Sequence, residues 1–327
     1  MIRDISFEIT QRCLNNCVHC SSCSDSLCKQ YIDYDTICKT IDDMPRIGVK
    51  RVCLSGGEPF LHKDIRSIVS YINKLDMEVN IYSSGIIEVE GQITYITYDE
   101  FKFLKESGLS KVMFNLQSYE SSRYDEIMGT VGRFSMVKES IKNAVEAGLY
   151  TEIHFVPMKI NIDDIDGIVE LAREMGVNKV SFLKLVPHGR ANENKDLIQL
   201  SAEETIELRN KLSKIKSETI RIGIPLSLDF DSDFCHAANS KLYIKFDGTV
   251  YGCEAFKYIQ QLDGESNVIE PNNIFESSLL EIYNNSKYLK ATQEFVKKYS
   301  CLDSKCESCP VQKYLEVKGE KQCRIIQ

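Results

Sequence analysis

Apolar and polar residues alternate or recur with helical spacing along most of the first 190 residues. Near the start, Ile5, Phe7 and Ile9 alternate with polar neighbours, which predicts a strand. The same reasoning predicts strands at 50–55, 77–83, 110–117, 150–157 and 178–187. Helical periodicity fills the intervals at 34–47, 63–75, 99–107, 134–147 and 163–175, the last two closed by Gly148 and Gly176. The pattern therefore predicts six strand–helix units.

Repeated strand–helix units with short loops predict parallel strands with helices packed outside them. This pattern fits a whole or partial barrel and an open doubly wound sheet equally well. In both folds the functional edge lies at the carboxyl ends of the strands. The unusual loops fall at this edge, namely "CLNNCVHC", "SGGEP", "SSG", "NLQSYE" and "VPHGR".

The pattern changes after residue 200. A helix at 201–218 and a strand-like stretch at 220–230 precede "KLYIKFDGTVYGC", a hairpin with an Asp-Gly turn, and then a helix near 276–285. We therefore expect two domains, 1–225 and 226–327, the second being small and rich in cysteine. Residues 86–98 are interpreted as a hairpin insertion or, equally, as a longer loop.

Charge and composition narrow the class of protein. The 327 residues carry a net charge of −8, which gives no electrostatic reason to bind nucleic acid. No apolar run is long enough to span a bilayer, and no secretory signal precedes the first strand. We expect a cytoplasmic protein that binds neither membrane nor nucleic acid.

Cysteine is unusually frequent for a reducing compartment. Of 13 cysteines, seven lie before residue 54 and six from residue 235 onward. An odd number argues against a closed set of disulfides, so metal or cluster ligation is the better interpretation. The gap between the two groups separates regions of different chemistry.

Cys13, Cys17 and Cys20 have the spacing C-x3-C-x2-C, which is short enough to surround one metal centre. A structural zinc site needs four protein ligands, and the fourth would have to be recruited from Cys23, Cys28 or His19. On a cubane cluster, three thiolates would instead leave one iron open to a substrate or cofactor.

The three-cysteine loop after a first strand, together with "SGGEP" at the end of the second, resembles the radical S-adenosylmethionine (SAM) family, and the likeness extends over about residues 1–195. The resemblance implies a partial (β/α)6 TIM-like barrel and a [4Fe–4S] cluster on Cys13, Cys17 and Cys20. It implies that the open iron binds SAM, which is split reductively to a 5′-deoxyadenosyl radical that abstracts a hydrogen atom. A one-electron donor such as flavodoxin or ferredoxin is then expected.

The same resemblance implies residues that bind SAM. The backbone at Gly56 and Gly57 and the carboxylate of Glu58 would receive the methionine ammonium, and His19 would lie near the adenine. Contacts to the ribose or carboxylate are expected from Ser83, Ser84, Asn115 and Gln117. Asn115 and Gln117 replace the Ser and Asp that are more usual in the family.

Strand parity suggests catalytic candidates that do not depend on the family. Polar residues share one parity in each strand, so Cys53, Glu152 and His154 should point into the barrel. A buried charge needs a partner or a role, so Glu152 and His154 are either catalytic or a satisfied hydrogen-bonded pair. Cys53 either donates a hydrogen atom to a product radical or packs as a small buried residue.

The second cysteine group resembles the SPASM extension of radical SAM enzymes that modify peptides, a SPASM/twitch-like domain. Cys235-x12-Gly248-x4-Cys253 matches its opening, and the tail from residue 301 resembles its close. The resemblance implies one or two auxiliary [4Fe–4S] clusters, the first on Cys235, Cys253 and Cys309, the second on Cys301, Cys306 and Cys323. Each lacks one thiolate, and Asp229 stands where the first missing ligand is expected. Zinc on the tail cysteines is the alternative.

The resemblance favours an enzyme that abstracts a hydrogen atom from a ribosomally made peptide, forming a cross-link, a thioether or an epimerised centre. The alternative is a small-molecule dehydrogenase or a cofactor-biosynthesis enzyme, because related tails occur there too. A structural or sensor protein could use the same cysteines but would not need "SGGEP" beside them.

Overall fold

The computed structural model describes residues 1–223, 226–227, 235–257, 259–262, 267–299 and 309–311. Its main sheet has the strand order β11-β10-β1-β2-β3-β6-β7-β8-β9. The strands are β1 (Asp4–Thr10), β2 (Arg51–Gly56), β3 (Glu78–Ser83), β6 (Leu109–Asn115), β7 (Tyr150–Phe155), β8 (Lys179–Phe182), β9 (Ile220–Ile222), β10 (Lys241–Ile244) and β11 (Val250–Tyr251). All neighbours pair in parallel except β10 and β11, which form the expected hairpin.

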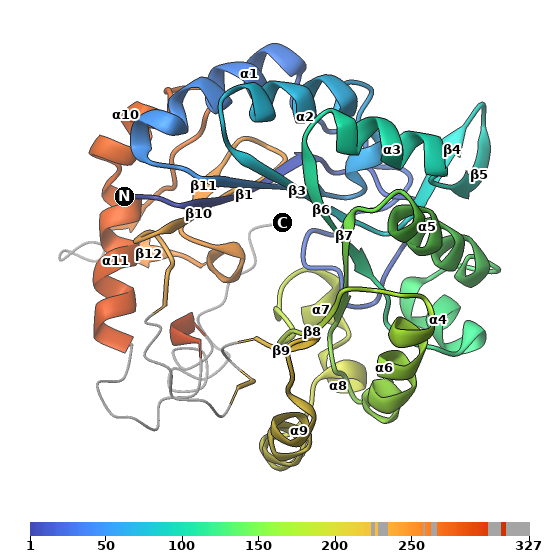
Figure 1. The fold of residues 1–327 in the computed structure, drawn as a ribbon. Helices are drawn as coiled ribbons and strands as arrows, with labels where there is room; N and C mark the ends of the chain where they lie inside the picture. Colours follow the sequence, from blue (N-terminus) through green and yellow to red (C-terminus); the bar gives the residue numbers. More distant parts are fainter. Residues whose placement is uncertain (224–225, 228–234, 258, 263–266, 300–308, 312–327) are drawn as a thin grey trace.

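Helices cover the outer face of the curved sheet (Figure 1). They are α1 (Tyr34–Asp43), α2 (Ile65–Lys74), α3 (Tyr98–Glu106), α4 (Ser121–Met128), α5 (Phe134–Glu146), α6 (Ile165–Glu174), α7 (Arg190–Glu193), α8 (Lys195–Ile198), α9 (Ala202–Ile215), α10 (Leu279–Asn285) and α11 (Lys287–Tyr299). Within the described chain, β9 and β11 end the sheet and do not pair with each other. The fold is therefore a partial barrel, which decides between the two architectures that the sequence allowed.

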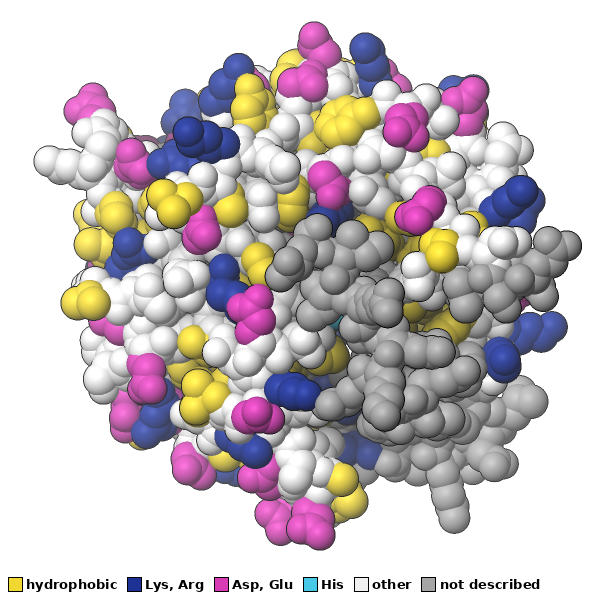
Figure 2. Space-filling view, turned by 180° about the vertical axis from the view of Figure 1, so that it is seen from behind, with side chains coloured by type: hydrophobic (Ala, Val, Ile, Leu, Met, Phe, Trp, Pro, Cys, Tyr) yellow, Lys and Arg dark blue, Asp and Glu magenta, His cyan; other side chains and the backbone are white. Residues whose placement is uncertain are grey.

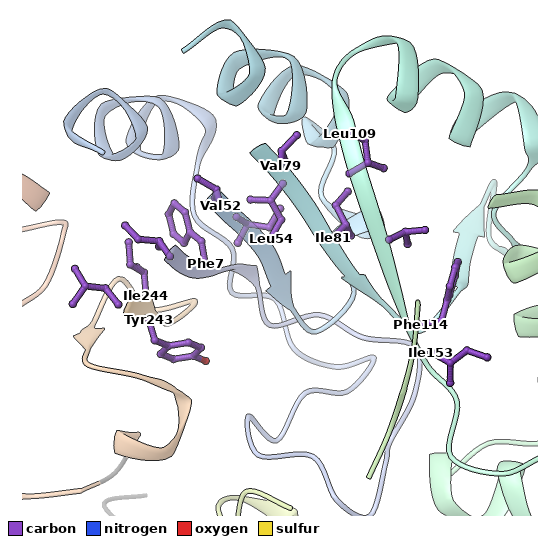
Figure 3. Packing of buried hydrophobic residues seen from close by; sticks show 14 of the residues in the cluster. Phe7, Val52, Leu54, Val79, Ile81, Leu109, Phe114, Ile153, Tyr243 and Ile244 are labelled. Carbon is purple, nitrogen blue, oxygen red and sulfur yellow. The ribbon is translucent and has the colours of Figure 1, made fainter. Parts of the chain in front are cut away.

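Alternate residues of each strand face the helices and form the core. In β1, Ile5, Phe7 and Ile9 are at most 1% exposed, while Ser6 and Glu8 point to the inner side. Figure 3 shows Phe7 with Val52, Leu54, Val79 and Ile81 from the neighbouring strands, packed beneath the outer helices. The parity predicted from the sequence is thus the parity of the structure.

Several predicted bounds need correction. The helix predicted at 34–47 ends at Asp43, because Pro45 has no backbone N–H to continue it, and a 3-10 turn, Pro45–Ile47, follows. Gly48, at φ 95°, then ends this turn. Helices α4 and α11 were not predicted. Residues 86–98 contain the hairpin of β4 (Ile86–Val89) and β5 (Gln92–Tyr95), and a second small pair joins β12 (Gln261–Leu262) to β13 (Val268–Ile269).

The predicted strand 220–230 is described only as β9, and the expected domain boundary near 225 falls outside the described residues. Beyond it, β10 joins the barrel sheet beside β1, with Lys241 opposite Asp4. No helix in the described ranges has the length and apolarity to cross a bilayer. On the face in Figure 2, acidic and basic side chains are interspersed over the visible described surface.

Candidate active site

The loop after β1 carries three cysteines at the carboxyl edge of the sheet. Cys13 and Cys17 are each 7% exposed and Cys20 is half-buried. Burial raises the pKa of Cys17 to about 12, and the charges of Cys17 and Cys20 further raise the pKa of Cys13, so the three groups are neighbours. In the described chain no three His, Cys, Asp or Glu side chains are placed to hold a single metal ion. Three neighbouring cysteines can instead each ligate a different iron of a cluster, whose binding would stabilise the thiolates.

Two arginines hold the backbone of this loop. From the loop after β8, Arg190 Nε donates to the Cys17 carbonyl at 2.9 Å, and its Nη2 donates to the Ser24 carbonyl at 2.6 Å. At the start of α5, Arg133 donates to the carbonyl of Leu14 and to Asn15 Oδ1. The guanidinium charges also lower the pKa of Cys17, against the larger effect of burial. These donors fix the loop and favour negative charge on it.

The carboxyl end of α4 supports the loop from another side. The amides of Asn16 and Val18 donate to the carbonyls of Met128 and Ile127 at 3.0 and 2.9 Å. Met128 Sδ lies 3.8 Å from Cys17 Sγ. The loop is thus packed between α4 and the segment after β8.

Gly56 and Gly57 lie against the start of the cysteine loop. The Gly57 amide donates to Thr10 O at 2.7 Å, and the Glu58 amide donates to Arg12 O at 2.8 Å. A Cβ atom on Gly57 would lie 2.1 Å from Arg12 O, and Gly56 has a φ of 135°. Only glycine therefore allows "SGGEP" to approach this close to the cysteine loop.

Glu58 is fully buried and accepts four hydrogen bonds. Ser83 Oγ donates at 2.9 Å, Ser84 donates through its amide and its hydroxyl at 2.6 and 2.5 Å, and the Phe60 amide donates at 3.2 Å. Burial raises the pKa of Glu58 to about 7, although these donors oppose it. The four donors match the acceptor capacity of a carboxylate, so an incoming ammonium would compete with the two serines.

Asn115, Gln117 and His19 lie near one another at the same edge. Gln117 donates to Asn115 Oδ1 and to His154 O, and accepts from the Val156 amide at 2.8 Å, so it joins β6 to β7. A hydrogen bond to Asn115 raises the pKa of His19, but burial and the charge of Arg190 lower it to about 4. His19 Nδ1 is buried without a partner among the described residues. A neutral imidazole with an unpaired nitrogen suits contact with a polar aromatic ring.

A cavity of about 400 Å³ lies inside the barrel, below this edge. Cys53, Tyr82, Met113 and His154 line its upper part. Charged residues also line it: Asp4, Arg51, Glu78, Lys179 and Lys241 are the first residues of their strands, and Lys111, Glu152 and Arg221 lie further along β6, β7 and β9. The structure therefore brings the three candidates chosen by strand parity, Cys53, Glu152 and His154, to one cavity.

Glu152 accepts hydrogen bonds from both His154 and Ser181. His154 Nε2 lies 3.1 Å from Glu152 Oε1, the Ser181 hydroxyl donates to the same oxygen, and Lys111 Nζ lies 3.4 Å from Oε2. Burial would raise the pKa of Glu152, but the hydrogen bonds from His154 and Ser181 and the charge of Arg221 lower it to about 2. Burial lowers the pKa of His154 despite the carboxylate. The cavity wall thus holds an anionic Glu152 and a neutral His154.

Cys53 lies between Ser6 and Asn80 in the sheet register. Burial raises the pKa of its thiol well above the usual range, so it stays protonated at neutral pH. A neutral thiol at a cavity wall can give a hydrogen atom, whereas a thiolate cannot.

In the second cysteine group, Cys235, Cys253 and Cys309 lie within electrostatic reach of one another. Charge on Cys309 raises the pKa of Cys235, and both raise that of Cys253, in each case after the larger effect of burial. These are the three cysteines that the resemblance assigned to the first auxiliary cluster, and their ligand role stays a prediction. The other candidates, Asp229, Cys301, Cys306 and Cys323, lie outside the described residues.

Several residues of the site were not identified from the sequence. Arg190 lies in the "VPHGR" loop, which the sequence placed at the site without choosing this side chain. Lys257 is almost fully buried and lies 3.3 Å from Glu8 Oε1 and 2.7 Å from Ser22 Oγ. Lys257 lies in the second cysteine region, and nothing in the sequence around it predicts a contact with β1.

Comparison with known proteins identifies two family models that match the chain. The model described as "Radical SAM superfamily" matches residues 7–172. The model described as "SPASM: Iron-sulfur cluster-binding domain" matches residues 235–310. The two matches contain the two cysteine groups respectively, apart from Cys323.

Curated relatives include enzymes of cofactor biosynthesis. Fe-coproporphyrin III synthase of Methanosarcina barkeri is 27% identical over 81% of this chain, which spans only 64% of that enzyme's length. GTP 3′,8-cyclase of Clostridium perfringens strain 13 is 25% identical, and the alignment covers 88% of this chain and 90% of that protein.

Among solved structures, Streptococcus suis SuiB bound to precursor peptide SuiA has a TM-score of 0.74 at 17% identity, covering 99% of this chain and 74% of that one. Native anSMEcpe with bound AdoMet has a TM-score of 0.65 at 13% identity and 96% coverage of both chains. These likenesses concern the fold.

Proposed function

Because the chain belongs to the radical SAM superfamily and carries a C-terminal SPASM iron–sulfur domain, we propose that it modifies a peptide by abstracting a hydrogen atom. It is a radical SAM enzyme whose cofactors are a [4Fe–4S] cluster, SAM and auxiliary iron–sulfur clusters. When both are bound, the first cluster and SAM supply the radical chemistry that removes a hydrogen atom from the substrate. The protein must bind the substrate, orient it and exclude water.

The position of the cavity carries this proposal. On β2, β3 and β6 the cavity is lined by Cys53, Tyr82 and Met113. The next residues on the same face are Ser55, Ser84 and Asn115, at the edge that holds the cysteine loop. Two residues of a strand rise about 6.6 Å. A substrate group in the cavity would therefore lie one pleat from SAM bound at that edge.

The proposed roles follow from the contacts. Cys13, Cys17 and Cys20 hold the first cluster, with Arg133 and Arg190 fixing their loop. Gly56 and Gly57 admit SAM beside that loop. Glu58 orients Ser83 and Ser84, and His19 offers its unpaired nitrogen to the adenine.

Within the cavity, burial keeps His154 neutral and Glu152 orients it beside Tyr82, whose ring centre lies 4.9 Å away. Cys53 donates a hydrogen atom to a product radical when the reaction inverts a stereocentre, and the sulfur radical left on Cys53 returns to the thiol by taking one electron from the one-electron donor and one proton from solvent. Cys235, Cys253 and Cys309 hold an auxiliary cluster near the Lys241–Glu254 ion pair.

A peptide substrate is supported by cavity size and by fold. About 400 Å³ accepts one or two amino-acid residues but not a large rigid ring system. SuiB, whose structure holds a precursor peptide, shares the fold over 99% of this chain. This support is an analogy of fold, and the substrate must be tested directly.

The test is anaerobic incubation of the reconstituted enzyme with SAM, a reductant and the short peptide encoded beside its gene. We expect 5′-deoxyadenosine together with a change of peptide mass or, for an epimerised product, of residue chirality. If 5′-deoxyadenosine forms and no neighbouring peptide changes, the peptide assignment is wrong while the SAM chemistry stands.

A small-molecule substrate is the second candidate, and the curated relatives favour it. Both the M. barkeri and the C. perfringens relative carry names of cofactor-biosynthesis enzymes. Gene context separates the two candidates, because a peptide substrate requires a short precursor reading frame and a cofactor precursor requires a biosynthetic cluster.

A further inference from the structure

We propose that the amino end of the barrel cavity is an anion subsite centred on Lys179, which binds a carboxylate or phosphate group of the substrate. The inference rests on the proposed function, because it assumes that the substrate enters this cavity. It adds a chemical requirement that neither the family nor the cysteine pattern contains.

Basic residues outnumber acidic residues on the cavity wall. Among the described residues that line it, five are basic and three are acidic. Arg51 is paired with both Asp4 and Glu78, at 2.9 and 3.1 Å. Lys111 and Arg221 lie 3.4 and 3.7 Å from Glu152. The acidic groups of the wall are thus all engaged by other cations.

The two remaining cations differ. Lys241 forms an ion pair with Glu254 at 2.8 Å, and Glu254 does not itself line the cavity. The side chain of Lys179 forms no ion pair or hydrogen bond with any residue in the described ranges, although Glu152 is its register neighbour on β7. Glu152 is instead held by His154, Ser181 and Lys111. Lys179 is therefore an uncompensated charge at the wall of a cavity.

A partly buried ammonium without a counter-ion is unfavourable, and an anionic ligand removes that cost. Arg221 on β9, whose Nε donates to Ser181 Oγ at 2.8 Å, is opposite Ser181, two residues along β8 from Lys179, and adds positive potential to the same cavity wall. A neutral substrate group would leave Lys179 without an anion.

The subsite also sets a distance between the anionic group and the reacting carbon. Lys179 is the register neighbour of Glu152 on β7, and Glu152 is the register neighbour of Met113 on β6, so Lys179 lies two residues below Asn115 at the upper edge. Two residues of strand correspond to about 6.6 Å. The anionic group should thus lie several bonds from the carbon that loses hydrogen, rather than on it.

The probe is glutarate, a small dianion, measured by equilibrium dialysis with the SAM-bound holoenzyme at low salt, under anaerobic conditions. We expect Lys179→Gln to weaken glutarate binding by about 10-fold or more, the typical effect of losing a charge-assisted bond. Lys179→Arg should keep most of the affinity. The matched control, Lys102→Gln on the exposed face of α3, should leave it unchanged.

Competition identifies the chemistry. Displacement of glutarate by inorganic phosphate supports a general anion subsite, displacement by acetate but not phosphate supports a carboxylate subsite, and neutral glutaramide should displace nothing. The inference is overturned if the wild type does not bind glutarate, or if Lys179→Gln binds it as the wild type does. Substrate-free formation of 5′-deoxyadenosine is measured in parallel. Its absence in the wild type would refute the proposed function instead.

Discussion

At the scale of single residues, the position of the cysteine loop depends on how closely the backbone at the end of β2 approaches it. Gly57 brings the end of β2 against Arg12, one residue before the first cysteine. Arg190 and Arg133 then fix the loop through its carbonyls. The cysteines are thus positioned by residues that carry no metal-binding chemistry themselves.

Gly57→Ala should lose most of the iron of the first cluster. Its Cβ would lie 2.1 Å from Arg12 O, so the cysteine loop must move. Iron and SAM binding per chain, measured after anaerobic reconstitution, should both fall. Gly91→Ala is the control, because Gly91, at φ 79° in the β4–β5 turn, would be strained locally but has nothing within 4 Å of its Cβ and does not touch the cysteine loop. Equal iron in the two variants would show that this approach does not position the cluster.

The pair of Glu152 and His154 predicts a pH dependence. Burial lowers the pKa of His154 below its usual 6.5 in the folded state. As pH falls below 6.5, the unfolded chain binds a proton first, so stability is lost, at most about 1.4 kcal/mol per pH unit.

His154→Gln should therefore make the thermal midpoint of the holoenzyme depend less on pH between about 7.5 and 5.5. The exposed His236 provides the control, as His236→Gln. If the thermal midpoint of the His154→Gln variant changed with pH as steeply as that of the wild type, His154 would not be the source of the pH dependence.

At the scale of elements, strand alternation separates stability from chemistry. On β2, Leu54 is fully buried against the helices, while Cys53 lies on the cavity side. The sequence predicted this division correctly because the alternation has a strict period of two.

Leu54→Ala should destabilise the protein by about 2–5 kcal/mol, because it leaves a void in the core. Cys53→Ala removes only one sulfur at an existing cavity and should cost much less. Chemical unfolding of both variants would measure the difference. If the two costs were equal, the assignment of faces on β2 would be wrong.

Element bounds were less predictable than element types. Pro45 ended α1 early, and α4 was missed because "SSRYDEIM" is polar and short. Its importance lies in tertiary contacts, since its carboxyl end holds the cysteine loop. Local periodicity contains no information on such contacts.

At the scale of the whole molecule, the SPASM region is tied to the barrel in two ways. Its strand β10 pairs with β1, and Lys257 reaches Glu8 and Ser22 beside the cysteine loop. The sequence predicted both cysteine groups but not this buried ion pair, because Glu8 and Lys257 are 249 residues apart.

Lys257→Met should destabilise the protein by about 3–5 kcal/mol, because it leaves the carboxylate of Glu8 buried without its cation. The double variant Glu8→Leu with Lys257→Met should recover much of the loss. Free energies of unfolding, measured for the wild type, both single variants and the double variant, give the interaction free energy between Glu8 and Lys257. Additive losses would mean that the two groups do not interact.

The central claim is that Cys13, Cys17 and Cys20 hold the cluster that cleaves SAM. The most direct test compares iron, sulfide and 5′-deoxyadenosine in the anaerobic wild type and the Cys13/Cys17/Cys20→Ala triple variant. We predict that the variant loses about four irons per chain, as for one [4Fe–4S] cluster, keeps its auxiliary iron and forms no 5′-deoxyadenosine. Unchanged iron, or SAM cleavage by the triple variant, would contradict the account.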